Sequence, residues 1–206
     1  MRRVRYVLAG GWILLLSACA VGSRQLPPSA VYDFGLAGAA GADGGAWVGI
    51  ALEVRTPPWF DALSIDYRLN YDDPLRPREY ADSRWAANPG GLIAQRLRQS
   101  LGFPAAGATS VCLLRIDVQE FSHVFDAPTV SRGVLQGSMT LVDGKRRVVA
   151  ERRLFVERAA TRSDARGGVE ALVRTVSGFQ EELAAWSQAL GSNPDARGCF
   201  SRSPPK

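Results

Sequence analysis

The second half of the chain carries the pattern that most constrains its fold. Stretches 111–121, 134–142 and 147–158 alternate between apolar and polar residues, which is typical of strands buried on one face. Asp143-Gly144 separates the last two stretches and is a hairpin turn signal. Over 165–190, apolar residues recur at spacings of three and four, which predicts a long amphipathic helix. Such a helix needs a sheet to cover its apolar face, so the pattern predicts a three-stranded antiparallel meander with a helix packed on it.

A second helix is predicted at 89–101. Asn88 can cap it, because its side-chain oxygen can accept a hydrogen bond from a first-turn amide. Pro89 fits the first helical position, where no amide hydrogen is needed, and Gly102 ends the helix. Four apolar residues fall on one face of this helix: Leu92, Ile93, Leu97 and Leu101.

Short strands are expected before this helix. The stretches that favour them lie at 31–34, 47–54, 64–70 and 78–82. The turn between the last two is assigned to Asp72-Asp73-Pro74. The order of strands, helix, meander and helix predicts an α+β fold: a two-layer sandwich in which two main helices pack on one face of an antiparallel or mixed sheet.

The N-terminus has the layout of a bacterial lipoprotein signal. Arg2, Arg3 and Arg5 precede an apolar run, 7–16, that is shorter than the roughly 20 residues of a membrane span. The run ends in Leu16-Ser17-Ala18-Cys19, which is a lipobox. In a lipobox, the small residues admit the signal peptidase and the thiol receives the diacylglycerol.

We therefore expect residues 1–18 to be removed and Cys19 to carry the lipid, which anchors the chain stably through more than one acyl chain. Ala20 follows the cysteine, and a residue other than aspartate there favours the periplasmic face of the outer membrane. An ordinary secretory signal cut near Ala20 and an uncleaved anchor helix are the alternatives. The mature chain is expected to divide into a tether at 19–29, one domain at 30–190 and a C-terminal tail at 191–206.

Two cysteines remain in the mature chain, Cys112 and Cys199. An oxidising compartment favours a disulfide between them, which would hold the C-terminal tail to the domain. Cys112 also lies on the apolar face of a predicted strand, where it could equally be a buried small hydrophobe. The sequence leaves both alternatives open.

The sequence offers no constellation for catalysis, and we expect neither an enzyme nor a cofactor or metal site. It contains no nucleophile motif, phosphate-binding loop or His/Cys cluster with metal-ligand spacing. The single histidine, His123, lies between Phe121 and Phe125, a setting more typical of a satisfied structural residue. Asp164 precedes the long helix and is expected to interact with the helix dipole.

Charge gives little indication of a nucleic-acid partner. The full chain has 25 basic and 20 acidic residues, a net charge of +5. Arg2, Arg3 and Arg5 belong to the signal, and without them 22 basic and 20 acidic residues give +2. Basic residues do cluster at 145–147 and 152–153, which predicts either a solvated hairpin tip and outer sheet face or a contact for an acidic partner or lipid head groups.

One stretch before the first helix combines aromatic and basic residues without a catalytic group. We expect a partner contact there, through five residues: Tyr67, Tyr71, Tyr80, Arg84 and Trp85. In this interpretation, Trp85 lies in the turn that leads from strand to helix.

Several motifs occur in an order that resembles a known family. They are the lipobox, the strand at Tyr32, the break at Pro57-Pro58-Trp59-Phe60, the Tyr80…Arg84-Trp85 transition, the run Phe121-Ser122-His123-Val124-Phe125-Asp126, and Ser131-Arg132-Gly133. Together they are similar to the ABC-type transport auxiliary lipoproteins, the group that includes the lipoprotein of the paraquat-inducible locus. The resemblance covers about 31–190 and departs from the family at the long Gly/Ala loop, 36–46.

The resemblance implies a role rather than a reaction. Such lipoproteins are partners of MCE-type (mammalian-cell-entry) ABC systems, which move phospholipids or other hydrophobic molecules between the inner and outer membranes. The ATPase, the permease and the periplasmic MCE-domain protein would be separate chains, and this chain would dock the MCE protein at the outer membrane. The alternatives are a carrier that itself binds a lipid and an outer-membrane assembly lipoprotein. Exposed edges of a short sheet would also permit a homo-oligomer.

Overall fold

The computed structural model describes residues 28–37, 47–60 and 62–200. The predicted signal peptide, Cys19 and most of the tether lie outside the described residues, as does most of the Gly/Ala loop. In the described part of the chain, no helix is both long and apolar enough to cross a membrane.

An antiparallel meander forms one side of the sheet, as the alternating pattern predicts. β5 (Cys112–Ala127) pairs with β6 (Val130–Val142), and β6 pairs with β7 (Val148–Ala159). Asp143 opens the last hairpin loop, and its Oδ1 accepts hydrogen bonds from the amides of Lys145 and Arg147, each at 2.9 Å. The apolar positions on the helix side of the meander are buried: Leu114, Ile116, Leu135, Met139, Leu141 and Leu154.

β5 extends beyond its predicted end at Phe121 and reaches Ala127. The register with β6 shifts between Val118 and Glu120, so the alternation of the sequence is lost there although the strand continues. After the shift, residues 121–125 are all buried, because both faces of the strand are covered.

The strands of the first half add to the other edge of β5. β2 (Ile50–Arg55) runs parallel to the beginning of β5 and β3 (Ser64–Leu69) runs parallel to its end, so both share one edge. β4 (Asp73–Trp85) is antiparallel to β3, and the short β1 (Ala30–Tyr32) is parallel to the end of β4. The seven described strands form one mixed sheet.

β4 differs most from its prediction. It has 13 residues instead of a short strand at 78–82. The turn before it lies at 70–72, so Asp73 and Pro74 already belong to the strand. Trp85 is the last residue of β4 and is not part of a turn.

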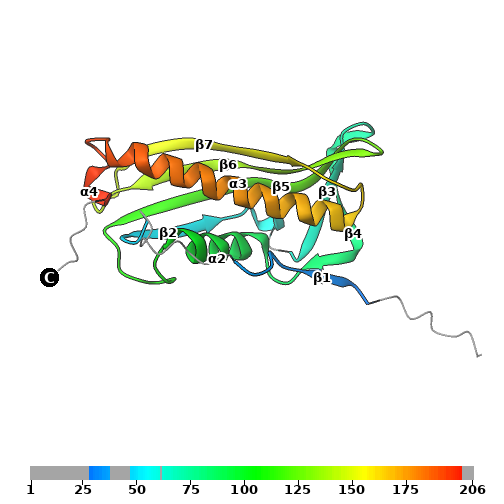
Figure 1. The fold of residues 1–206 in the computed structure, drawn as a ribbon, viewed down its shortest axis with the longest axis horizontal. Helices are drawn as coiled ribbons and strands as arrows, with labels where there is room; N and C mark the ends of the chain where they lie inside the picture. The colour runs from blue at the N-terminus through cyan, green and yellow to red at the C-terminus, as the bar shows by residue number, and fades with distance from the viewer. Residues whose placement is uncertain (1–27, 38–46, 61, 201–206) are drawn as a thin grey trace, which may run out of the picture.

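Both main helices lie on the same face of the sheet (Figure 1). α2 (Pro89–Leu101) packs on β2, and α3 (Ala165–Gly191) crosses β5, β6 and β7. Oδ1 of Asn88 accepts the first-turn hydrogen bond from the Gly91 amide at 2.7 Å, and Gly102 takes the left-handed conformation, so α2 begins and ends as predicted. The predicted α+β fold of a mixed sheet with two main helices packed on one face is confirmed. The break at Pro57 is followed by a short 3-10 helix, η2 (Pro58–Phe60).

The first part of the predicted tail packs on the core of the domain. Cys112 and Cys199 form a disulfide with their Cα atoms 5.6 Å apart, which is the first of the two alternatives. Cys199 belongs to α4 (Arg197–Phe200), and the ring of Phe200 meets Trp47 edge-on. Trp47 is 1% exposed and also stacks on Phe103, with ring centroids 5.1 Å apart.

The segment after β1 lies between α2 and α3. Phe34 is buried, and its ring centroid lies 5.5 Å from that of Trp85 and 6.1 Å from that of Phe121. Arg96 of α2 donates hydrogen bonds to the carbonyl oxygens of Phe34 and Gly35. The buried ring and the guanidinium together fix the N-terminal segment to the core.

Candidate functional site

The five residues predicted for a partner contact do not form one surface. Arg84 is exposed, and Tyr71 is 48% exposed. Tyr67 and Tyr80 are half-buried, with their ring centroids 4.7 Å apart. Trp85 is 1% exposed and lies among the core rings, so its assignment as a contact residue is wrong. The physical reason is that β4 continues to Trp85 and turns this side chain towards the helices.

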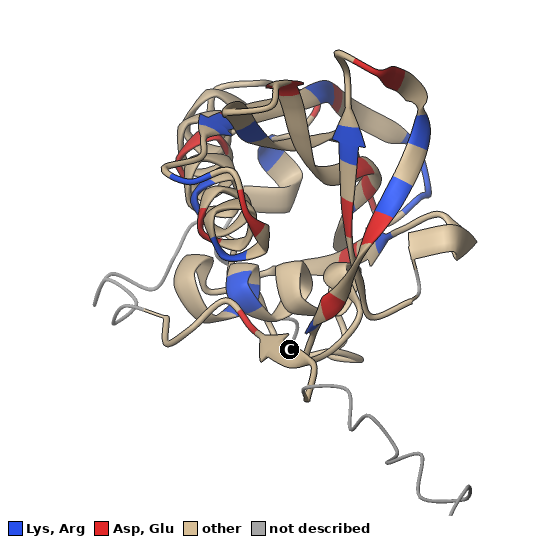
Figure 2. Ribbon diagram, turned by 90° about the vertical axis from the view of Figure 1, so that its right-hand side faces the viewer, with Lys and Arg blue, Asp and Glu red and all other residues tan. Residues whose placement is uncertain are grey.

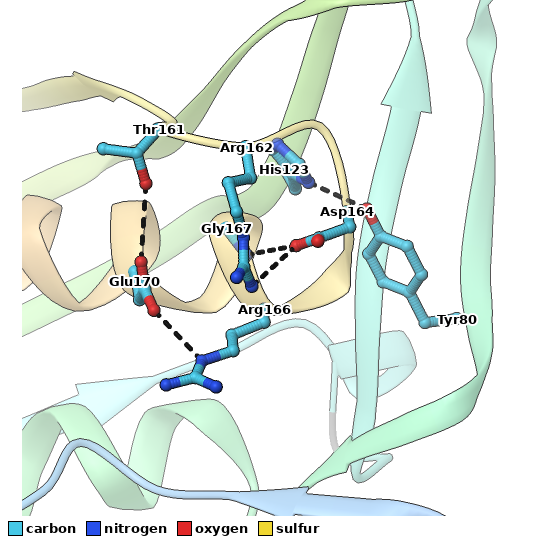
Figure 3. Close-up of polar contacts among 8 residues, drawn as sticks. All are labelled: Tyr80, His123, Thr161, Arg162, Asp164, Arg166, Gly167 and Glu170. Atoms are coloured by element: carbon cyan, nitrogen blue, oxygen red, sulfur yellow. Dashed lines mark hydrogen bonds and ion pairs between the residues drawn. The ribbon is translucent and has the colours of Figure 1, made fainter.

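Tyr80 is one half of a part-buried polar pair (Figure 3). Its hydroxyl lies 2.8 Å from Nδ1 of His123, which is 43 residues further along the chain. Burial lowers the pKa of His123 to about 4, so the imidazole is neutral near pH 7. Burial also raises the pKa of Tyr80, so the hydroxyl keeps its proton. The pair is therefore a neutral hydrogen bond that joins β4 to β5.

His123 lies in the interior of the domain, and its hydrogen bonding is incomplete. The residue is 0% exposed. Among the described residues, its Nε2 has no hydrogen-bond partner. An unpaired polar atom in the interior costs free energy. The packing of the neutral ring and its hydrogen bond with Tyr80 offset this cost.

The start of α3 fits closely against this pair. A side-chain carbon added at Gly168 would lie 2.4 Å from Nδ1 of His123. Gly133 of β6 pairs with His123, and a carbon added there would lie 2.7 Å from backbone atoms of Ala171 and Leu172. The two glycines therefore let α3 lie directly on β5 and β6. Three positions that carry the family resemblance, Tyr80, His123 and Gly133, are thus brought together by the fold.

Charged side chains surround the N-terminus of α3 (Figure 3). Asp164 caps the helix by accepting a hydrogen bond from the Gly167 amide at 2.7 Å. This hydrogen bond and the nearby Arg162 guanidinium lower the pKa of the Asp164 carboxyl. In the next turn, Glu170 accepts a hydrogen bond from Arg166 at 3.3 Å. The arrangement stabilises the helix start, as expected for Asp164 from the sequence.

A second group of titratable side chains lies on the opposite face of the sheet, on β3, β4 and β5. Asp66 is half-buried beside Glu79 of β4, its partner in the register, and near Glu120 of β5. Burial raises the pKa of Asp66 to about 6, the hydrogen bond from Ser64 opposes this rise, and the charges of Glu79 and Glu120 add to it. Arg68 pairs with Glu120 at 2.9 Å. Asp66 is thus a carboxyl whose ionisation the fold disfavours.

Replacing Asp66 with asparagine should stabilise the protein at neutral pH. The pKa of the carboxyl is about 6 in the fold against an ordinary 3.8, so the folded state binds the proton more tightly than the unfolded chain. The free energy of unfolding therefore rises as the pH falls from 6 towards 3.8. After allowance for partial exposure, we expect Asp66→Asn to gain about 1 kcal/mol near neutral pH and nothing near pH ~4.

Urea unfolding of both proteins at the two pH values measures this difference. Asp195→Asn, at an exposed position before α4, is the matched control and should change the free energy of unfolding at neither pH. A variant at Asp66 that behaves like the control would contradict the prediction.

Two grooves flank the segment that follows β1. One, of about 220 Å³, lies against α2, and its lining includes Leu92 and Arg96. The other, of about 460 Å³, lies against α3, and its lining includes Val31, Val169 and Arg174. Both are open to solvent and combine apolar with charged side chains. Neither groove is an enclosed chamber of the kind that would hold an acyl chain.

The basic cluster lies at the β6–β7 hairpin and on β7. Lys145 and Arg146 are exposed in the loop, and Arg147 pairs with Asp143 at 2.8 Å. The residues at 152–153 are exposed on β7, which is an edge strand of the sheet. These positions are exposed, which both interpretations of the cluster require. In the described ranges, no group of three or more His, Cys, Asp or Glu side chains could hold a metal ion.

The fold is similar to solved structures, although no family model and no curated protein matches the sequence. The crystal structure of a Xanthomonas campestris protein assigned to family DUF330 matches with a TM-score of 0.64 and 18% identity, over 76% of this chain and 94% of that one. The crystal structure of an uncharacterized protein matches with a TM-score of 0.59 and 12% identity, over 77% of this chain and 98% of that one. Since nearly the whole of each neighbour is covered, the shared unit is a complete domain, and at these identities the likeness concerns the fold alone.

Proposed function

We propose that this protein is a membrane-anchored periplasmic lipoprotein that acts, without catalysing a reaction, as an auxiliary component of an MCE-type ABC transporter. Its role is to hold the MCE-domain protein at the outer membrane. Separate permease and ATPase chains move phospholipids or other hydrophobic molecules between the membranes. The lipobox at 16–19 carries the proposal, because it accounts for both the anchor and the compartment.

Three further observations support the proposal. A disulfide between Cys112 and Cys199 suits an oxidising compartment such as the periplasm. The residues on which the family resemblance rests pack on one another, since Tyr80 bonds His123 and His123 pairs with Gly133. The two grooves are open and partly charged, which suits contact with a protein better than enclosure of a lipid.

Photo-cross-linking in native envelopes tests the proposal. A photoreactive residue is introduced in turn at Arg84, Arg152 and Arg174, which lie on β4, β7 and α3. We expect mass spectrometry of the cross-linked products to identify an MCE-domain protein, with the highest yield from Arg84. Capture of no such protein from any of the three positions, by a chain that is acylated, would contradict the proposal.

Acylation is tested separately. Mass spectrometry of the N-terminal peptide should find that it begins at Cys19 and that Cys19 carries the lipid. A lipid carrier would give a different pattern, in which lipid in a one-to-one amount survives purification and no transporter chain is captured.

A further inference from the structure

Two hairpins end side by side at one end of the molecule. The amide of Asn70, in the β3–β4 turn, donates a hydrogen bond to the carbonyl oxygen of Phe125 at 2.8 Å. The side-chain amide of Asn70 also donates to Asp126 at 3.2 Å. Residues 70–76 and 126–130, which we name the paired tips, therefore form one structure at the right-hand end in Figure 1.

The paired tips expose apolar side chains that no described element covers. Leu75 is 88% exposed, Val130 is 58% exposed and Tyr71 is 48% exposed. Single exposed apolar residues are common on any protein, but here an aliphatic, a β-branched and an aromatic side chain occur on one protrusion. Tyrosine and tryptophan are typical of the zone where a membrane meets water.

Two of the three carboxylates of the paired tips form ion pairs within the protein. Asp72 pairs with Arg78 at 2.5 Å, and Asp126 pairs with Arg132. Oδ1 of Asp73 accepts a hydrogen bond from the Leu75 amide at 3.1 Å. Figure 2, which views this end, shows acidic and basic residues interspersed along the strands. A surface with paired carboxylates loses less hydration free energy when it approaches lipid head groups.

Arg76 is the basic residue of the paired tips. It is exposed next to Leu75, and among the described residues it forms no ion pair. A long basic side chain can place its guanidinium at lipid phosphates while its neighbour enters the apolar zone. Leu75 and Arg76 together therefore fit the boundary of a bilayer.

The direction of β1 is compatible with an anchor at the end of the molecule that carries the tips. β1 is parallel to β4, with Ala30 beside Ser83. Followed backwards, both strands therefore run in the same direction. For β4 this direction leads from Ser83 to Asp73, which lies at the tips. Ten residues of strand separate Ser83 from Asp73, about 33 Å. Eleven residues separate Ala30 from Cys19 and can span at most ~40 Å. The tether is thus long enough for the anchor to reach the level of the tips, with little to spare.

Prolines make strand addition at this place unfavourable. The outer edge of β4 is paired with β1 only at residues 83–85. Pro74 and Pro77 lie in the part that β1 does not cover, and neither has an amide to donate to a further strand. The exposed side chains of the tips, and not the backbone edge, are the group available for contact.

We propose that the paired tips rest on the membrane that holds the Cys19 anchor, with Tyr71, Leu75 and Val130 in the interfacial zone and Arg76 at the lipid phosphates. This inference depends on the acylation of Cys19 in the proposed function. The lipid anchor and the tips then form two points of attachment, which fixes the orientation of the domain to the bilayer.

Depth-dependent fluorescence quenching tests the contact. Full-length acylated protein is reconstituted into vesicles of phosphatidylethanolamine and phosphatidylglycerol, with a fraction of lipids that carry a doxyl quencher near the head-group end of the acyl chain. Leu75→Cys takes an environment-sensitive label, since Cys112 and Cys199 are joined in the disulfide. We expect blue-shifted emission and strong quenching. The matched control is Val148→Cys, at a position that is 60% exposed. Val148 pairs with Val142, and Val142 pairs with the start of β5, away from the tips. A label there should show neither the blue shift nor the quenching.

A second variant tests whether the tips act together. With the label at Val130→Cys, the additional change Leu75→Asp should reduce quenching about threefold, because the β3–β4 tip no longer enters the apolar zone. Equal quenching at positions 75 and 148, with Cys19 acylated, would overturn the inference and leave the anchor intact. Shielding of the label only after an MCE-domain protein is added would also overturn it, in favour of a protein interface. An unmodified Cys19 would instead contradict the proposed function.

Discussion

Trp85→Ala is expected to lower the free energy of unfolding by about 3–5 kcal/mol, the range found when a large buried aromatic side chain is removed. The indole is 1% exposed, and its ring centroid lies 5.8 Å from that of Phe121 and 5.5 Å from that of Phe34. The cavity left behind would open at the junction of β1, β4 and β5. Urea unfolding followed by far-ultraviolet circular dichroism measures the change without relying on tryptophan fluorescence.

Trp59→Ala is the matched control for that experiment. Trp59 lies in η2 and is 73% exposed. Its removal should change the free energy of unfolding by less than ~0.5 kcal/mol, as is usual for surface positions. If the two alanine variants were equally stable, Trp85 would not be the core residue described above.

Loss of the disulfide is expected to have an effect of similar size. The bridge joins residues 87 apart in sequence, and closing a loop of that length stabilises the fold by about 4.6 kcal/mol in the chain-entropy model. The double variant Cys112→Ala/Cys199→Ala should therefore unfold at a much lower urea concentration than the parent. It should also lose part of the packing of Phe200 on Trp47, because α4 is held to β5 by this bridge.

Reduction provides an independent measurement of the same bond. Adding dithiothreitol to the parent protein should shift its unfolding midpoint towards that of the double variant, whose own midpoint should not move. A parent protein that is equally stable with and without reductant would contradict the disulfide.

The sequence predicted the elements whose structure is set by residues close together in the chain. The meander follows from alternation on both sides of Asp143, and α2 follows from Asn88, Pro89 and Gly102, which act within one turn of the helix. Asp164 was recognised because a capping carboxylate lies next to the helix that it caps. In each case, the residues that decide the structure are neighbours in the sequence.

Features that depend on distant contacts were not predictable. The two parallel pairings with β5 join residues from Ile50 to Leu69 to a strand that begins at Cys112, and no spacing in the sequence records this. The pairs Tyr80–His123 and Asp66–Glu120 depend on the order of the strands, in which β4 and β5 lie on either side of β3. Trp85 was misassigned for the same reason, since its burial comes from β1 and the helices and not from its neighbours in sequence.

The pairing of β1 with β4 determines how the domain would bear mechanical load. If Cys19 is held in a bilayer, tension enters the domain along the axis of β1. The register pairs from Ala30–Ser83 to Tyr32–Trp85 would then be loaded together in shear, instead of being peeled apart one at a time. Behind them, the ring of Phe34 and the guanidinium of Arg96 resist withdrawal of the segment. A strand of three residues, supported by Phe34 and Arg96, would thus be the first part of the domain to bear tension from the anchor.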